Sequence, residues 1–228
     1  MDSTVHVGLG DDPALEFLNT AAAPAPRRRS ELIGSGPSYL AWLGRTELLA
    51  AADLESAREV FSPDELDAAA SAARDLREIL RSVVAVWAGD RLSPVDPFVV
   101  ARLNTVLAAG GRYTQLHVKR EVAELRNRHH WVSTGQLLLP VAQAWACLLT
   151  GGDPRLVRMC AGCTIWFYDR TKSHRRRWCS MALCGNRAKV RRHRQLSAPQ
   201  GGQARSRPSG SPSTGYPVHD VSRTAETR

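Results

Sequence analysis

The sequence predicts a mainly α-helical N-terminal domain with a small antiparallel β-hairpin or sheet, followed by a compact cysteine-rich unit that ends in a basic helix. Three observations support this fold class. Apolar residues recur at helical spacing from Leu66 to Trp87, and residues 113–125 alternate loosely, as strands do. Four of the five cysteines lie between Cys160 and Cys184. With 228 residues, the chain can bury one good core and carry a small second unit.

Composition divides the chain into four parts. We expect a flexible start over residues 1–12, a helical domain over 13–152 and the cysteine-rich unit over 153–196. After Leu196 the sequence turns to Gln, Gly, Ser, Pro and Arg, which cannot bury enough apolar surface to become ordered. We therefore expect residues 197–228 to form a disordered tail.

The clearest predicted helix begins at Ser62. Ser62 supplies an N-cap, Pro63 occupies the first helical position and Glu65 completes a capping box. Apolar residues then follow along one stripe of the helix: Leu66, Ala69, Ala73, Leu76, Leu80, Val83 and Trp87. Gly89 is the stop signal. We expect a central helix about 40 Å long whose stripe faces the core.

Shorter elements are predicted by the same kinds of signal. They are a helix or turn over 14–20, a helix capped by Ser38 and running through Trp42, helices over 96–109 and 136–150, and strands within 113–125 and over 129–133. Paired glycines end two of these helices, at Gly110-Gly111 and Gly151-Gly152. Cys147, in the last of these helices, is expected to be a buried small hydrophobic residue.

The positive charge of the chain is concentrated in one segment. The formal net charge is +9, but residues 158–194 alone hold eleven Arg and Lys residues and one acid, Asp169. No acid occurs in residues 171–219, so neighbouring ion pairs cannot neutralise this charge. Such a block indicates a polyanionic partner. We expect Asp169 to cap a turn or to pair with a local arginine.

The four clustered cysteines have the spacing of a metal site. The pair Cys160-x2-Cys163 is followed, after fifteen residues, by Cys179-x4-Cys184. In a cytosolic chain, clustered cysteines bind metal more often than they form disulfides. Four thiolates make a closed structural zinc site with no open position for water. We therefore expect one structural zinc ion per chain, in a treble-clef-like or zinc-ribbon-like unit, and redox use of the first pair is the weaker alternative.

A basic helix is predicted over residues 184–195, directly after the last cysteine. A helix anchored by zinc and rich in arginine suits the major groove of DNA or a run of phosphates. The expected nucleic-acid contacts are Arg175, Arg176, Arg177, Asn186, Arg187, Lys189, Arg191, Arg192 and Arg194. For Arg187 the alternative is a place beside the zinc, where its charge offsets the formal −2 of a tetrathiolate. The aromatic residues Trp166, Phe167, Tyr168 and Trp178 are expected mostly to cover the metal site.

The segment "RRWCSMALCGNRAKVRRHR" resembles the bacterial CGNR zinc-finger family, which is named for the run that falls on Cys184 to Arg187. The preceding chain resembles the ABATE domain, at "LEFLNT", "SYLAWL", "DLREIL" and "LNTVLA". The resemblance implies a mostly helical domain with a small sheet, followed by a zinc finger that binds DNA, in a family described as stress-related transcription regulators. The four cysteine ligands of that family fall on Cys160, Cys163, Cys179 and Cys184.

The sequence thus predicts a cytosolic, nucleoid-associated regulator that binds duplex DNA and is not an enzyme. We expect the N-terminal domain to sense a small-molecule effector, to form a homodimer, or both. No catalytic motif such as G-x-S-x-G or H-E-x-x-H occurs. The longest apolar run, residues 137–150, is too short and mixed to span a membrane, and no secretory signal is evident.

Two alternatives remain open. One is an RNA-binding or ribosome-associated zinc protein, because phosphate contacts do not distinguish the two polymers. The other is an enzyme or small-molecule-binding domain that carries the finger as an accessory.

Overall fold

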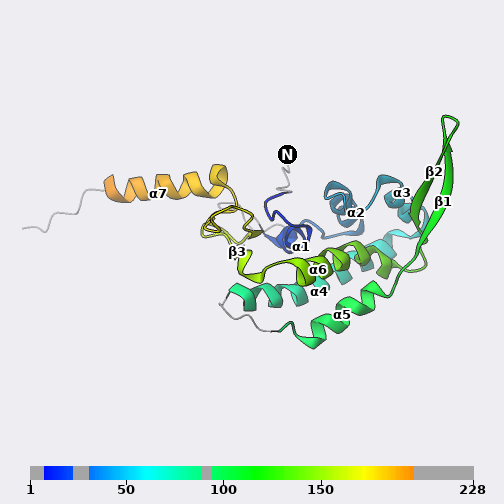
Figure 1. The fold of residues 1–228 in the computed structure, drawn as a ribbon, viewed down its shortest axis with the longest axis horizontal. Helices are drawn as coiled ribbons and strands as arrows, with labels where there is room; N and C mark the ends of the chain where they lie inside the picture. The colour runs from blue at the N-terminus through cyan, green and yellow to red at the C-terminus, as the bar shows by residue number, and fades with distance from the viewer. Residues whose placement is uncertain (1–7, 23–30, 89–93, 198–228) are drawn as a thin grey trace, which may run out of the picture.

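The computed structural model describes residues 8–22, 31–88 and 94–197 (Figure 1). Residues 1–7 of the expected flexible start (1–12), the stop signal at Gly89 and residues 198–228 of the expected disordered tail (197–228) lie outside the described residues. The elements of the N-terminal domain are α1 (Pro13–Leu18), the 3₁₀ turn η1 (Asn19–Ala21), α2 (Gly36–Arg45), α3 (Ala51–Val60), α4 (Pro63–Ala88), α5 (Pro97–Leu107), β1 (Arg112–Lys119), β2 (Val122–His129), η2 (Thr134–Leu138) and α6 (Leu139–Gly151). The C-terminal unit comprises η3 (Pro154–Leu156), β3 (Val157–Met159), β4 (Trp166–Tyr168), the π-helical turn η4 (Met181–Gly185) and α7 (Asn186–Ser197). The predicted fold class is confirmed: a mainly helical domain with an antiparallel hairpin precedes a small cysteine-rich unit with its own antiparallel pair.

The central helix is α4, as its capping signals and apolar stripe predict. The Ser62 hydroxyl accepts a hydrogen bond from the Glu65 backbone N–H, and the Glu65 carboxylate accepts one from the Ser62 N–H. All seven residues of the predicted stripe are buried. α4 packs against α1, α2 and η2, and α6 packs against α1 and α5. The largest buried side chains of this core include Trp42, Trp145 and Tyr39, so aromatic area contributes much of its stability.

Several local predictions were wrong in detail. Ser35, not Ser38, caps α2, and Ser38 forms the other half of the capping box. The strand expected over 129–133 is absent from the described chain, because His129 is the last residue of β2. Cys147 is exposed, since it lies on the outer side of α6. Helix α3 was not predicted.

The hairpin of β1 and β2 extends away from the helices (Figure 1). Its two-residue turn consists of Arg120 and Glu121, with φ values of 49° and 67°. Both residues adopt the left-handed region that a type I′ turn requires, at a cost of about 1–3 kcal/mol for each non-glycine residue. At the base of the hairpin, the His129 N–H donates to Asp53 Oδ1 of α3 at 3.3 Å. Over the described residues, no helix combines the length and the apolar character needed to cross a membrane.

Candidate metal centre and basic surface

The four clustered cysteines converge on one point. Their sulfur atoms all lie within 4.8 Å of one another. The Sγ atoms of Cys163 and Cys179 are 3.7 Å apart, and those of Cys179 and Cys184 are 3.8 Å apart. A tetrahedron with metal–sulfur bonds of about 2.3 Å has edges of about 3.8 Å. Two of the sulfur–sulfur distances therefore match a tetrahedral metal site, and all four sulfurs lie close enough together to bind one ion.

Two backbone turns place the sulfurs. In the first, between β3 and β4, the Cys160 N–H donates to Ile165 O at 2.9 Å, and the Gly162 N–H points to Cys160 Sγ at 3.4 Å. In the second, Ser180 caps η4 through its hydroxyl, and the Cys184 N–H donates to Ser180 O at 3.0 Å. The Ala161 N–H donates to Arg177 O at 2.9 Å and thereby joins the two turns. The spacing of the cysteines could not by itself reveal this link.

The electrostatics of the cluster call for a cation. A hydrogen bond with the Cys179 thiol lowers the pKa of Cys163 to about 5. The same hydrogen bond and burial raise the pKa of Cys179 far above its ordinary value, and burial raises that of Cys184 to about 12. Four thiolates cannot share this volume without compensating charge, which a divalent metal ion supplies. The residues present therefore fit a metal, and the four cysteines form a metal site.

A small apolar shell surrounds the metal site. Phe167 is fully buried against the cysteines, and Trp178 packs on the same cluster. Trp166 and Tyr168 instead pack on the core of the N-terminal domain, because successive residues of strand β4 face opposite sides. The expectation that the aromatic residues mostly cover the metal site thus holds for two of the four.

Arg187 lies beside the metal site. It lines a small cavity with Cys184 and Trp178. Its Nη1 atom is buried, and among the described residues it has no hydrogen-bond partner. A guanidinium in this position offsets the negative charge of four metal-bound thiolates. The burial of this one atom beside the cysteines favours this role over a contact with nucleic acid.

Asp169, the one acid of the basic segment, shapes the loop before the second cysteine pair. It is fully buried. Its Oδ1 accepts the Thr171 hydroxyl at 2.6 Å, and its Oδ2 accepts the Arg176 N–H at 2.9 Å. Arg158 Nε lies 3.7 Å from the same carboxylate. Burial raises the pKa of Asp169, but these donors outweigh it and leave that pKa below the ordinary value. Asp169 is therefore structural, as expected.

Arg176, one of the predicted nucleic-acid contacts, has its guanidinium engaged within the protein. Its guanidinium donates to the carbonyls of Trp178 and Cys179 and pairs with Asp11 Oδ2 at 2.5 Å. It also lies 4.6 Å from the centre of the Phe167 ring. Because these partners already use the guanidinium, Arg176 ties the finger to the N-terminal segment and is not a free cation.

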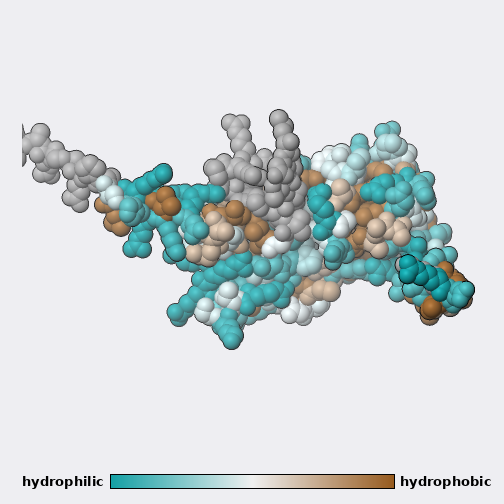
Figure 2. Space-filling model, turned by 90° about the horizontal axis from the view of Figure 1, so that it is seen from above, coloured by the Kyte–Doolittle hydropathy of each residue, from teal (hydrophilic) through white to brown (hydrophobic). Residues whose placement is uncertain are grey.

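The other predicted contacts lie on the surface. α7 has no buried residue, and it projects from the finger at one end of the molecule, where hydrophilic side chains stand out (Figure 2). The basic residues of α7 other than Arg187 are exposed: Lys189, Arg191, Arg192 and Arg194. Asn186, Arg175 and Arg177 are exposed as well. Arg177 stacks on Trp178, with its guanidinium 5.3 Å from the ring centre. The observed helix spans Asn186–Ser197, slightly later than the expected 184–195.

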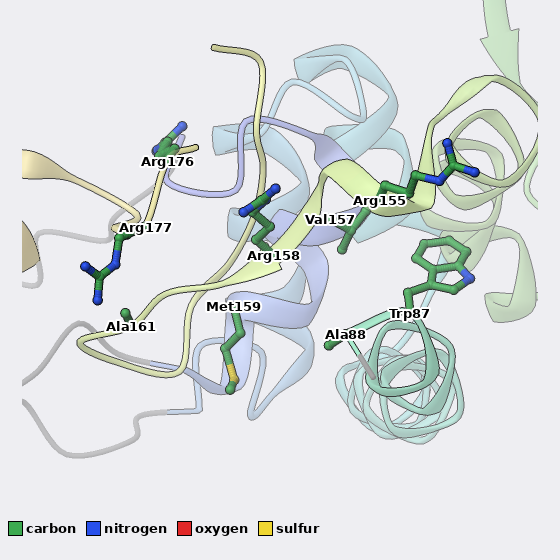
Figure 3. Close-up of a pocket in the computed structure, with 9 residues that line it drawn as sticks. All are labelled: Trp87, Ala88, Arg155, Val157, Arg158, Met159, Ala161, Arg176 and Arg177. Carbon is green, nitrogen blue, oxygen red and sulfur yellow. The ribbon is translucent and has the colours of Figure 1, made fainter. Parts of the chain in front are cut away.

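A second group of arginines contains two, Arg155 and Arg158, that the sequence analysis did not single out. An open groove of about 620 Å³ runs between the end of α4 and the finger. Arg155, Arg158 and Arg177 line it, and Figure 3 shows Arg158 between the other two. Trp87 and Met159 give it an apolar side. Only the fold brings these residues together, since Trp87 belongs to α4 and the arginines to the finger.

Two protein-family models match the chain. The ABATE model, described as "Putative stress-induced transcription regulator", matches residues 11–152, which is more than half of the sequence. The CGNR zinc finger model matches residues 156–196, which include the four metal-site cysteines and the basic helix. No curated protein matches the chain. The resemblance noted in the sequence is thus confirmed, and the chain belongs to the ABATE family and carries a C-terminal CGNR zinc finger.

Proposed function

We propose that the protein is a transcription regulator that binds duplex DNA at the nucleoid through its finger. The observation that carries the proposal is α7, a helix without acidic residues that begins beside a metal ligand and exposes its arginines. A helix of this width fits the major groove, and its guanidinium groups suit phosphates and guanine edges. The family description supports the regulatory role.

The metal of the finger is zinc in this proposal. Four clustered cysteine sulfurs are the donor set that zinc prefers in structural sites. When bound, the ion cross-links the two turns and neutralises two of the four thiolate charges. Because four sulfurs leave water no coordination position, we assign no hydrolytic chemistry to the metal site.

The DNA-binding surface in this proposal has two parts. α7 forms one part with Lys189, Arg191, Arg192 and Arg194, together with Arg175 and Arg177. The arginine groove forms the other, and Arg177 belongs to both. No acidic residue lines the groove itself, so phosphates that leave α7 meet a net positive surface there, although Arg158 also lies 3.7 Å from the buried carboxylate of Asp169. We leave Arg176 out of the set, and we assign Arg187 to the metal site.

Fluorescence anisotropy with labelled duplex DNA tests the proposal. If about six phosphates are contacted, log K should fall against log salt with a slope near −5. The double variant Arg191→Ala/Arg194→Ala should weaken binding and lower that slope by about two. The matched control, Arg45→Ala/Arg58→Ala, removes the same charge from exposed positions of the N-terminal domain and should bind as the unmodified chain does.

Two outcomes would contradict this function. A salt-independent affinity would mean that phosphates do not dominate binding. Structured RNA that displaces the labelled duplex at lower concentration than unlabelled duplex would favour the RNA-binding alternative, because both polymers offer phosphates.

A further inference from the structure

The β1–β2 hairpin has two chemically different faces. Directly opposed residues share a face, and the register pairs Leu116 with Leu125 and Val118 with Ala123. These four residues, the apolar face, carry no charge, and they lie toward the tip of the hairpin. Toward its base the same side continues with Thr114, Asn127, Arg112 and His129. The other face holds His117 and the charged residues Glu124, Arg126 and Arg128, and Arg126 forms an ion pair with Glu124. The arm is therefore amphipathic.

The apolar face is exposed in the single chain. Leu116 is 66% exposed, Val118 64% and Leu125 74%. Each strand makes its main contacts with the other strand of the hairpin, and the arm stands away from the helices (Figure 1). Hydrophobic atoms are visible at this end of the molecule (Figure 2). A contiguous apolar surface of this kind marks an interaction site on a soluble chain.

The arm also needs a partner for its own stability. A lone two-stranded hairpin is marginal in water, because half of its side chains find nothing to pack on. Its turn is made of two non-glycine residues in the left-handed region, Arg120 and Glu121, which weakens it further. Both strand edges are free within the described chain, so a neighbouring strand can add to either.

We propose that a second copy of this chain covers the apolar face, so that two arms pack face to face about a two-fold axis. The apolar face is uncharged, so it offers no complement to a charged partner. It is complementary to a second copy of itself, because a two-fold axis between the leucine pairs places Leu116 and Leu125 of one copy against those of the other. The charged face is a less suitable dimer interface, because Glu55 and Glu59 of α3 lie across a groove from its base. The inference does not depend on DNA binding.

The small size of the interface determines the strength of the dimer. Four side chains cover less than the roughly 800 Å² per partner of a standard interface. The dimer should therefore dissociate on dilution. Its arms lie at the end of the molecule opposite α7 (Figure 1), so dimerisation leaves both fingers accessible.

Sedimentation equilibrium of the full chain with zinc, after nuclease treatment, tests the inference. The mass should rise with concentration from 25.0 kDa toward twice that value. Leu116→Glu/Leu125→Glu should keep the mass of one chain at every concentration. The control Gln115→Glu/His117→Glu adds two glutamates to the opposite face of the same arm and should still dimerise. Circular dichroism and zinc content should match in all three proteins.

Cross-linking gives a second readout. In a Cys147→Ser background, Leu125→Cys should form a disulfide-linked dimer under mild oxidation, whereas Gln115→Cys should not. An unmodified chain that stays at one chain mass, or equal dimerisation of the Leu116→Glu/Leu125→Glu variant and its control, would overturn the proposal. So would equal cross-linking from the two faces.

Discussion

Asn19 and Trp166 pair through two hydrogen bonds across 147 residues of sequence. The Asn19 Nδ2 donates to Trp166 O at 2.8 Å, and the Trp166 N–H donates to Asn19 Oδ1 at 2.9 Å. Asn19 follows α1, and Trp166 begins strand β4 of the finger. The side-chain amide thus acts as an additional strand residue for β4. It joins the ABATE domain to the finger at a buried position.

Replacing Asn19 with alanine should destabilise this junction. The change leaves the buried N–H and C=O of Trp166 without partners, and each unpaired group costs about 1–3 kcal/mol. We expect a loss of about 2–4 kcal/mol and a lower melting temperature, measured by differential scanning calorimetry. Asn104→Ala, at an exposed position of α5, is the control and should change stability by less than about 0.5 kcal/mol. Equal melting temperatures for the two variants would show that the pair contributes nothing.

Glu16 should make stability fall as pH rises. Burial is the main cause that raises its pKa from 4.5 to about 7, although the Gly10 N–H bonded to its carboxylate acts in the opposite direction. Between these two values the folded chain holds a proton that the unfolded chain has lost, so each step up in pH favours unfolding. The full effect is on the order of 3 kcal/mol and is complete above about pH 7.

Glu16→Gln isolates this effect. The amide keeps a carbonyl oxygen for Gly10 but does not titrate. Its melting temperature relative to the unmodified chain should therefore increase from about pH 5 to about pH 8. Metal binding depends on pH over the same range in both proteins, so its contribution cancels in the difference between their melting temperatures. A constant difference across this range would mean that Glu16 ionises in the folded protein as it does in water.

Cys179→Ser should remove the metal and the folding energy that comes with it. Structural zinc contributes on the order of 10 kcal/mol to finger-sized units. Elemental analysis should find about one zinc per unmodified chain and close to none in the variant. Acidification should also release the metal, because protons compete for the thiolates. Cys147→Ser is the control, since that cysteine is exposed and remote from the site, and it should retain the full metal content.

DNA binding should be lost together with the metal. The ion fixes Cys184, and α7 starts at Asn186, so loss of the metal frees the basic helix from the rest of the finger. Anisotropy should show weakened binding by Cys179→Ser and normal binding by Cys147→Ser. Unchanged affinity in the metal-free variant would separate the two properties and refute their coupling.

Local signals made much of this structure predictable. The capping box at Ser62 and the stripe along α4 carry their own information, and the cysteine spacing defines the metal ligands. Helix α3 lacks such signals: it begins at Ala51 without a side-chain cap, and it buries only Asp53, Leu54 and Ala57. Its buried Asp53 accepts a hydrogen bond from the backbone N–H of His129, a partner that lies far along the chain.

Whether an individual arginine is exposed or engaged within the protein was less predictable, because this depends on partners that are distant in the sequence. In the sequence, Arg175, Arg176 and Arg177 are equivalent members of one run. In the structure, Arg176 meets Asp11, which lies 165 residues away, while its two neighbours stay exposed. The sequence likewise left two roles open for Arg187, a nucleic-acid contact or a place beside the zinc, and only the folded positions of the sulfurs favour the second.

The adjacent residues Arg175 and Arg176 should therefore respond differently to the same substitution. Arg176→Ala leaves the carbonyls of Trp178 and Cys179 without their donor and removes the ion pair with Asp11. The melting temperature should therefore drop, and a chromogenic chelator should extract zinc faster. Arg175→Ala removes an exposed side chain, so stability should stay within about 0.5 kcal/mol while the salt dependence of DNA binding weakens by about one phosphate. If Arg175→Ala lowered the melting temperature as much as Arg176→Ala, the distinction between a structural and a DNA-contacting arginine would fail, because a solvated guanidinium has no buried partner to lose.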